Sequence, residues 1–107
     1  MKLLNEELLK QFEEVGRQEH VEDPVVIAKF FNPCGSGTWY ATEFYSEDRL
    51  FFGYVSLFND PFCNEFGYFS LDELQELKCP PFGLPIERDL YFKQSPISEV
   101  KKRERVY

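Results

Sequence analysis

The chain has no apolar run approaching the roughly 20 residues that a helix needs to cross a bilayer. Its start, MKLLNEELLK, reaches acidic side chains within a few residues. A secretory signal would instead follow its positive start with an apolar stretch. These absences predict a cytoplasmic protein that has no membrane partner.

Cysteine and histidine are scarce. The 107 residues include three cysteines and one histidine, and the odd number and irregular spacing of the cysteines do not fit a disulfide framework, which agrees with a reducing compartment. The C-x₂₋₄-C knuckle typical of zinc sites is also missing. Four residues in predicted loops could still form such a site, with an Asp or Glu as a substitute for the histidine. These candidate zinc ligands are Cys34, Cys63, Cys79 and His20.

Basic residues are missing from the middle of the chain. Arg49 is the only one between Lys29 and Lys78, a stretch that holds eight acids. The whole chain has 12 Lys and Arg against 19 Asp and Glu, a net charge of −7. Such a body repels nucleic acid phosphates and attracts basic protein surfaces. We therefore expect no direct binding of nucleic acid and a partner with a basic surface, such as a nuclease.

Motifs that carry catalytic chemistry are missing too. CGSG precedes a predicted strand, so no helix N-terminus there presents amides to a phosphate. In GLPIERDLYF, Glu87 and Asp89 could share one face of a strand, but Arg88 points to the other face and no nucleophile lies nearby. We expect this triplet to be structural, with a carboxylate accepting hydrogen bonds from the CPPFG loop and Arg88 pairing with an acid. The sequence predicts a protein that is not an enzyme.

Aromatic residues are abundant. The chain has twelve Phe, six Tyr and one Trp, and each such side chain can bury roughly 150–250 Å². This content suits a small domain, which buries only about two-thirds of its unfolded surface. We expect one domain over residues 1–100 and a solvated basic tail, KKRERVY, over residues 101–107.

Two helices can be predicted from their caps. Asn5 is a suitable N-cap, apolar residues with helical spacing follow as far as Val15, and Gly16 is a suitable stop. Later in the chain, Ser70 and Glu73 form an S-x-x-E capping box. We therefore expect one helix at the start of the chain and a second one directly after residue 70.

Strands are predicted where β-branched and aromatic residues alternate with turn sequences. The expected strands are residues 25–31, 38–45, 49–57 and 65–69, with an edge strand at 89–92. Gly53, inside the third strand, indicates a bulge or a close backbone contact. This order predicts an α+β fold: a small antiparallel sheet of four to five strands, an N-terminal helix, and a second helix before the last strand.

The motifs TWYATEF, FFGYV, EFGYFSLDEL and GLPIERDLYF together resemble a family of short proteins of unknown function from plasmids, conjugative elements and phage-like islands. The similarity runs from about residue 2 to residue 100. It implies an origin in mobile DNA and no particular activity. The three cysteines lie where the family pattern does not typically have them, so any role of theirs would belong to this protein or a close subgroup.

These observations predict a non-enzymatic interaction protein that binds a basic protein surface. Its concrete form would be an inhibitor of a defence nuclease, of the anti-CRISPR or anti-restriction kind, because such nucleases hold nucleic acid in positively charged channels. An exposed aromatic face could also form a homodimer. The candidate partner-binding residues are Glu43, Glu47, Asp48, Asp60, Glu65, Asp72, Glu73 and Glu76, with Trp39, Tyr45 and Phe62 as aromatic anchors. The alternative is a small zinc-stabilised structural or regulatory domain.

Overall fold

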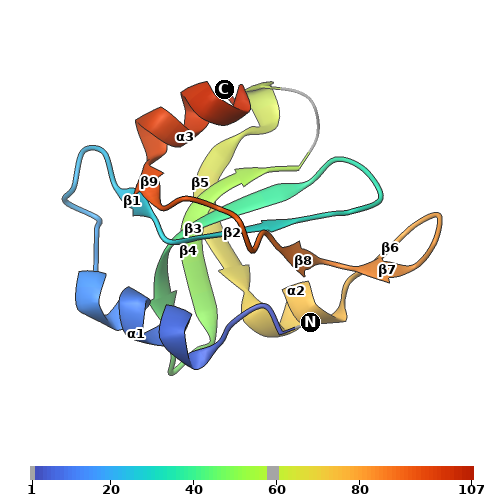
Figure 1. Cartoon of the computed structure of the whole chain (residues 1–107), viewed down its shortest axis with the longest axis horizontal. Helices are drawn as coiled ribbons and strands as arrows, with labels where there is room; N and C mark the ends of the chain where they lie inside the picture. The colour runs from blue at the N-terminus through green and yellow to red at the C-terminus, as the bar shows by residue number, and fades with distance from the viewer. Residues whose placement is uncertain (1, 58–60) are drawn as a thin grey trace.

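A five-stranded antiparallel sheet with the strand order β5-β4-β3-β2-β8 forms the centre of the molecule (Figure 1). This architecture comes from a computed structural model that describes residues 2–57 and 61–107. The sheet strands are β2 (Ala28–Phe31), β3 (Thr38–Tyr45), β4 (Leu50–Ser56), β5 (Glu65–Ser70) and β8 (Glu87–Arg88). The helices are α1 (Glu6–Val15), α2 (Leu71–Glu76), α3 (Ile97–Glu104) and the 3₁₀ turn η1 (Pro61–Cys63). The predicted α+β fold is confirmed.

Two short strand pairs complete the fold. The chain forms β1 (Val25–Val26) with β9 (Ser95–Pro96), and β6 (Lys78–Cys79) with β7 (Leu84–Pro85). The expected single strand over residues 25–31 is therefore divided at Ile27 into β1 and β2, which pair with different parts of the chain. No helix in the described part of the chain is long and apolar enough to cross a membrane.

The helix α1 begins and ends where its caps predict. Asn5 Oδ1 accepts a hydrogen bond from the Leu8 amide at 2.8 Å, and Gly16 ends the helix with a φ of 69°, a conformation that glycine adopts without strain. On its inner face, Phe12 is buried, with its ring centroid 5.8 Å from that of Phe51 in β4. The helix therefore covers one face of the sheet.

The capping box of α2 is formed as predicted, with Ser70 Oγ accepting from the Glu73 amide at 3.2 Å. Leu71 and Leu74 of this helix are buried in the same apolar cluster as Phe12 and Phe51. Thus α1 and α2 close the main core over one face of the sheet. Burial of the apolar side chains in this core supplies most of the favourable free energy of folding.

The helix α3 covers part of the opposite face and corrects the expectation of a solvated tail. Ile97 and Val100 are buried in a second cluster with Tyr40 and Tyr54, and Val106 packs against it. Two residues of the charged run KKRER also face the sheet, since Lys101 Nζ lies 4.2 Å from the Tyr54 ring centroid and Glu104 accepts a hydrogen bond from the Tyr40 hydroxyl. The residues from 101 onward are therefore part of the folded domain.

The close approach predicted at Gly53 is confirmed. A Cβ on this residue would lie 1.9 Å from the Tyr40 carbonyl oxygen, so no side chain fits there. The register of β3 against β4 shifts between Ala41 and Glu43 beside this contact. Gly67 in β5, the cross-strand neighbour of Gly53, has open space beside it, since a Cβ there would meet nothing within 4 Å.

The last strand of the sheet lies earlier than we expected. Glu87 and Arg88 form β8 and pair with Phe31 and Phe30 of β2, whereas residues 89–92 are not a strand. The prediction of a strand at 89–92 followed its apolar residues, but pairing at a sheet edge depends on the backbone and tolerates charged side chains.

Candidate functional site

An exposed strip of aromatic rings crosses the part of the sheet face that α3 leaves uncovered. We call Tyr45, Phe52, Phe66 and Tyr68, from β3, β4 and β5, the aromatic strip. The Phe52 ring centroid lies 4.9 Å from that of Tyr68 and 6.0 Å from that of Phe66. Tyr68 is 64% exposed and Phe66 42% exposed. Contiguous exposed rings of this kind are typical of contact surfaces between proteins.

Tyr45 lies at one end of the strip, where it contacts Glu43 and Arg17. Its hydroxyl donates to Glu43, and the Arg17 guanidinium lies 5.5 Å from its ring centroid. Burial, together with the hydrogen bond to Glu43, raises the pKa of Tyr45 to about 12. The phenol is therefore held protonated and keeps its hydrogen bond to Glu43.

Four exposed carboxylates surround the end of β5 next to the strip, and we call them the acidic end. Glu47 and Asp48 lie in the turn between β3 and β4, and Asp72 and Glu73 open α2. The Leu71 amide donates to the Arg49 carbonyl at 3.0 Å, which holds the turn beside the start of the helix. The acidic end is therefore formed by two segments that are separated in the sequence.

One base lies within the acidic end. The Arg49 guanidinium binds Asp72 through Nε at 2.9 and 3.0 Å and through Nη2 at 2.8 Å. This carboxylate raises the pKa of Arg49 through a hydrogen bond and its charge. Asp72 is therefore engaged, while the other three carboxylates supply the negative charge that this end offers to a partner.

The remaining predicted partner residues have different environments. Glu43, expected on the surface, is 4% exposed, and Trp39, expected as an anchor, is 8% exposed in the main core. Those two assignments are wrong because β3 is a central strand, buried on both faces over most of its length. Phe62 is 98% exposed, and Glu65 at the start of β5 is also exposed.

Two further predicted acids complete this comparison. Glu76, in the last turn of α2, is exposed beyond the acidic end. Asp60 lies outside the described residues. Of the predicted carboxylates, those that the structure brings to one place are therefore Glu47, Asp48, Asp72 and Glu73.

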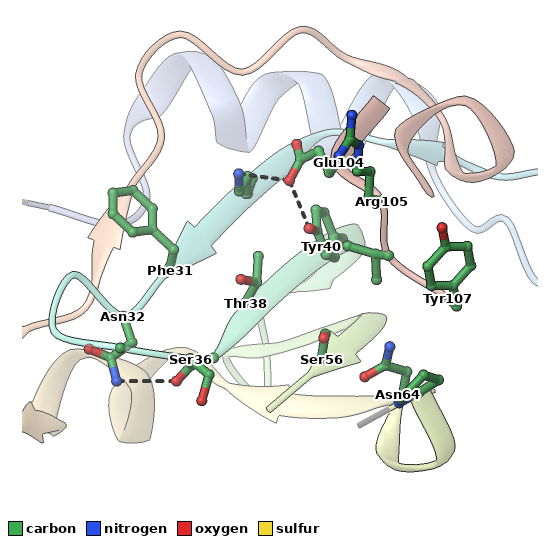
Figure 2. A pocket seen from close by; sticks show the side chains of 15 residues that line it. Phe31, Asn32, Ser36, Thr38, Tyr40, Ser56, Asn64, Glu104, Arg105 and Tyr107 are labelled. Carbon is green, nitrogen blue, oxygen red and sulfur yellow. Dashed lines mark hydrogen bonds and ion pairs between the residues drawn. The ribbon is translucent and has the colours of Figure 1, made fainter. Parts of the chain in front are cut away.

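A polar pocket of about 600 Å³ lies at the other end of the sheet, near the end of α3. Figure 2 shows Phe31 and Tyr107 on opposite sides of it, with Glu104 and Tyr40 between them. Glu104 Oε1 accepts from the Tyr40 hydroxyl at 2.7 Å and lies 2.7 Å from Lys29 Nζ. This ion pair and hydrogen bond join β2, β3 and α3.

The groups of this pocket are mostly engaged with each other. Burial and the bond to Glu104 raise the pKa of Tyr40, so its phenol acts as a hydrogen-bond donor. Lys29 also lies 3.7 Å from Asp89. Asn64 Oδ1 is buried without a hydrogen-bond partner in the described part of the chain. The central charges of the pocket therefore neutralise one another, and the Asn64 oxygen is a buried acceptor at its wall.

The structure does not bring the four candidate zinc ligands together: Cys34 packs against the main core, to which Cys79 belongs, whereas the other two lie elsewhere. His20 has a side chain that is 95% exposed beside Glu19, and Cys63 is exposed in η1. Cys79 is buried, and its burial, with a smaller effect of Cys34, raises the pKa of its thiol. Among residues 2–57 and 61–107, no three His, Cys, Asp or Glu side chains gather as metal ligands would.

In the charged triplet of GLPIERDLYF, Arg88 and Asp89 bind different segments of the chain. Arg88 Nη1 donates to the Leu3 carbonyl at 3.3 Å, and Asp89 pairs with Lys29 and accepts from the Tyr91 amide at 3.0 Å. For Asp89, the expected hydrogen bonds from the CPPFG loop are thus replaced by a local bond to Tyr91 and an ion pair with Lys29 of β2. Arg88 and Asp89 fasten the N-terminal segment and the end of β8 to the rest of the fold.

Sequence reasoning missed Phe66 and Tyr68 as surface residues. Their alternation in EFGYF, on either side of Gly67, is a signal of two side chains on one face of a strand. Which face stays open depends on where α3 docks. The network of Lys29, Tyr40 and Glu104 left no local signal, because Glu104 lies 64 residues from Tyr40 and still further along the chain from Lys29.

Fold and surface together define a small α+β domain with an exposed aromatic strip beside a group of carboxylates. The chain belongs to the family described as "Protein of unknown function (DUF2958)", whose model matches residues 2–105. The expected membership of a family of unknown function is confirmed, whereas its origin in mobile DNA stays a prediction. No curated protein and no solved structure matches the chain.

Proposed function

We propose that this protein is a non-enzymatic interaction module that binds a basic surface of a partner protein through the aromatic strip and the acidic end. The observation that carries this proposal is the exposure of Phe66 and Tyr68 at one margin of the sheet, next to the carboxylates. Exposed rings can supply the anchors of an interface, while the surrounding charge steers a partner of opposite sign.

The kind of partner follows from the sign of the charge. The chain carries −7 overall, and the acidic end has a single base, which is paired with Asp72. Proteins that bind nucleic acid expose cationic channels, which an acidic domain can occupy. In its concrete form, the proposal is that the protein inhibits a nuclease of a host defence system, such as a CRISPR effector or a restriction enzyme.

Mixing the protein with a Cas9-type effector and with a restriction nuclease tests this form of the proposal. We expect co-elution and slower DNA cleavage at about 50 mM salt, and weaker binding at about 500 mM, because salt screens exposed charges. The double variant Glu47→Lys/Asp48→Lys should bind at least about tenfold more weakly. Glu22→Lys/Glu99→Lys makes the same charge change at exposed sites elsewhere and is the matched control.

Two results would count against the proposal. If neither nuclease binds at any salt concentration, the defence-nuclease form is excluded. If both double variants weaken binding equally, net charge alone explains the attraction and the acidic end has no special part in it.

A further inference from the structure

The hydrogen bonds at the end of β5 determine which of its backbone groups face β4. In an antiparallel pair, opposite residues alternate between exchanging both backbone hydrogen bonds and exchanging none. The Leu71 amide donates to the Arg49 carbonyl, in register with the β4–β5 pairs. The odd-numbered residues of β5 therefore bond to β4. The N–H and C=O groups of Phe66 and Tyr68 point away from the sheet.

The same alternation accounts for bonds across the rest of the sheet. The Asn32 amide donates to the Gly37 carbonyl at 2.9 Å, which directs the even-numbered residues of β2 toward β3. The Asp89 amide donates to the Lys29 carbonyl at 2.9 Å, so the odd-numbered residues of β2 face β8. The assignment of outward groups in β5 follows from the same rule.

The outer side of β5 has no strand beside it within the described ranges, 2–57 and 61–107. Proteins usually protect such an edge with proline, charge, a bulge or a very short strand. Here the strand has six residues, its only charge is Glu65 at the first position, and the two outward-bonding residues carry exposed rings. This edge has the properties of a template for another strand.

The charges around the edge select its occupant. Glu65 lies at one end of β5 and the acidic end lies at the other. Antiparallel pairing with a second copy would bring Glu65 of each molecule against the acidic end of the other, and like charges placed together are destabilising. An extended segment that carries Lys or Arg meets carboxylates at both ends instead.

We infer that β5 binds its partner by strand addition, pairing the backbone of Phe66 and Tyr68 with an extended segment of another protein in which Lys or Arg alternates with apolar residues. Main-chain hydrogen bonds supply affinity in this mode, and alternate side chains supply specificity. The apolar residues of the segment lie beside the rings of the aromatic strip. This inference rests on the proposed function and adds to it the binding mode and the kind of segment recognised.

Amide exchange measured by NMR tests the inference, with a synthetic eight-residue peptide of alternating Lys and Val as the probe. We expect the amides of Phe66 and Tyr68 to exchange at least about tenfold more slowly when the peptide is bound, because they become hydrogen-bonded. A peptide with Glu in place of Lys should give no protection. Absence of protection at both amides would overturn strand addition, and protection that grows with protein concentration alone would make a second copy the occupant.

A pair of variants separates the backbone from the ring. Tyr68→Ala removes the ring and keeps the outward N–H, whereas Tyr68→Pro removes both, and proline is tolerated on the solvent side of an edge strand. We expect Tyr68→Pro to bind the peptide about tenfold more weakly than Tyr68→Ala. Phe66→Pro and Phe66→Ala repeat the comparison, and the near-ultraviolet signal of buried Trp39 confirms folding. Equal affinities within both pairs would overturn strand addition.

The two proposals fail in distinguishable ways. If Glu47→Lys/Asp48→Lys weakens binding to a nuclease while the proline and alanine variants bind that nuclease equally, the proposed function stands and strand addition is wrong. If the peptide protects the β5 edge while neither nuclease binds, the binding mode stands and the defence-nuclease partner is wrong.

Discussion

The two edges of the sheet differ in how far the chain itself covers them. At one edge, β8 has two half-buried residues, and Arg88 binds the Leu3 carbonyl while Asp89 pairs with Lys29. At the other edge, β5 has six residues and exposes the rings of Phe66 and Tyr68. Since the other edge of the same sheet is protected, the open edge is a local property of β5, and an open apolar edge is a template on which another strand can pair.

The protection of the β8 edge depends on charged groups from three elements. Lys29 from β2 lies between Glu104 of α3 and Asp89, which follows β8. Such partly buried charges stabilise a fold when each has its partner, and destabilise it when one partner is lost. The β5 edge is free of this constraint, so its residues can change with little effect on folding.

The largest effect is expected from the two glycines that face each other in β4 and β5. Gly53→Ala places a Cβ 1.9 Å from the Tyr40 carbonyl oxygen, so the inner strands must separate, and we expect a loss of roughly 3 kcal/mol or more in the free energy of unfolding. In Gly67→Ala, the new Cβ meets nothing within 4 Å, so the free energy of unfolding should change by less than about 1 kcal/mol.

Urea denaturation followed by circular dichroism measures both variants. If Gly67→Ala proved as damaging as Gly53→Ala, then the space beside the Cα of Gly67 would not be open in solution, and the contrast between the two glycines would fail.

The next largest effect concerns the protected edge. Glu104→Ala leaves Lys29 partly buried, with Asp89 at 3.7 Å as its remaining carboxylate, and leaves the Tyr40 hydroxyl without its acceptor. We expect a loss of roughly 2 kcal/mol in the free energy of unfolding, since both charged side chains keep some solvent contact. Thermal unfolding measures this loss, with Glu99→Gln, an exposed position on the same helix, as the control variant. An equal, small shift in both variants would contradict this account.

Amide exchange in the free protein should show the contrast within β5 itself. The outward amides of Phe66 and Tyr68 should exchange at least about tenfold faster than the amides of Gly67 and Phe69, which bond to β4. Two-dimensional NMR spectra recorded after transfer to deuterated water measure these rates. A uniform rate along β5 would mean that the outward groups already have partners.

The smallest effect is expected at high pH. The pKa of Tyr45 is raised to about 12, above the ordinary value of about 10, so folding favours the protonated phenol. The stabilisation from its bond to Glu43 is fully present below pH 10 and is lost as the pH rises through 12. The difference in unfolding free energy between the native protein and Tyr45→Phe should therefore shrink from pH 9 to pH 12. A constant difference would contradict the hydrogen bond.

Local rules predicted the helices and strands well where neighbouring residues decide them. Asn5, Gly16 and the box of Ser70 with Glu73 fix the helix ends through bonds within a few residues. The alternation of TWYATEFY gave the limits of β3 as observed. Gly53 was predicted to mark a bulge or a close backbone contact, because glycine inside a strand often marks one of the two, and the structure shows the close contact.

The same rules could not place side chains that depend on distant partners. Trp39 was expected on the surface and is buried, because nothing in its own segment shows that β3 is central. KKRER was expected to be solvated, although the apolar side of its helix packs on Tyr40 and Tyr54 from the sheet. Of the predicted surface acids, Glu43 is buried beneath Tyr45.

The sequence by itself determined the first two helices, most strands of the sheet, the fold class and the excess of negative charge, because these depend on local backbone preferences and on composition. Only the tertiary structure decided which carboxylates meet at the end of β5, which rings stay exposed and which edge of the sheet is left open. These outcomes depend on strand order and on the docking of α3, which bring together residues far apart in the chain. A protein-binding surface is formed by such long-range neighbours.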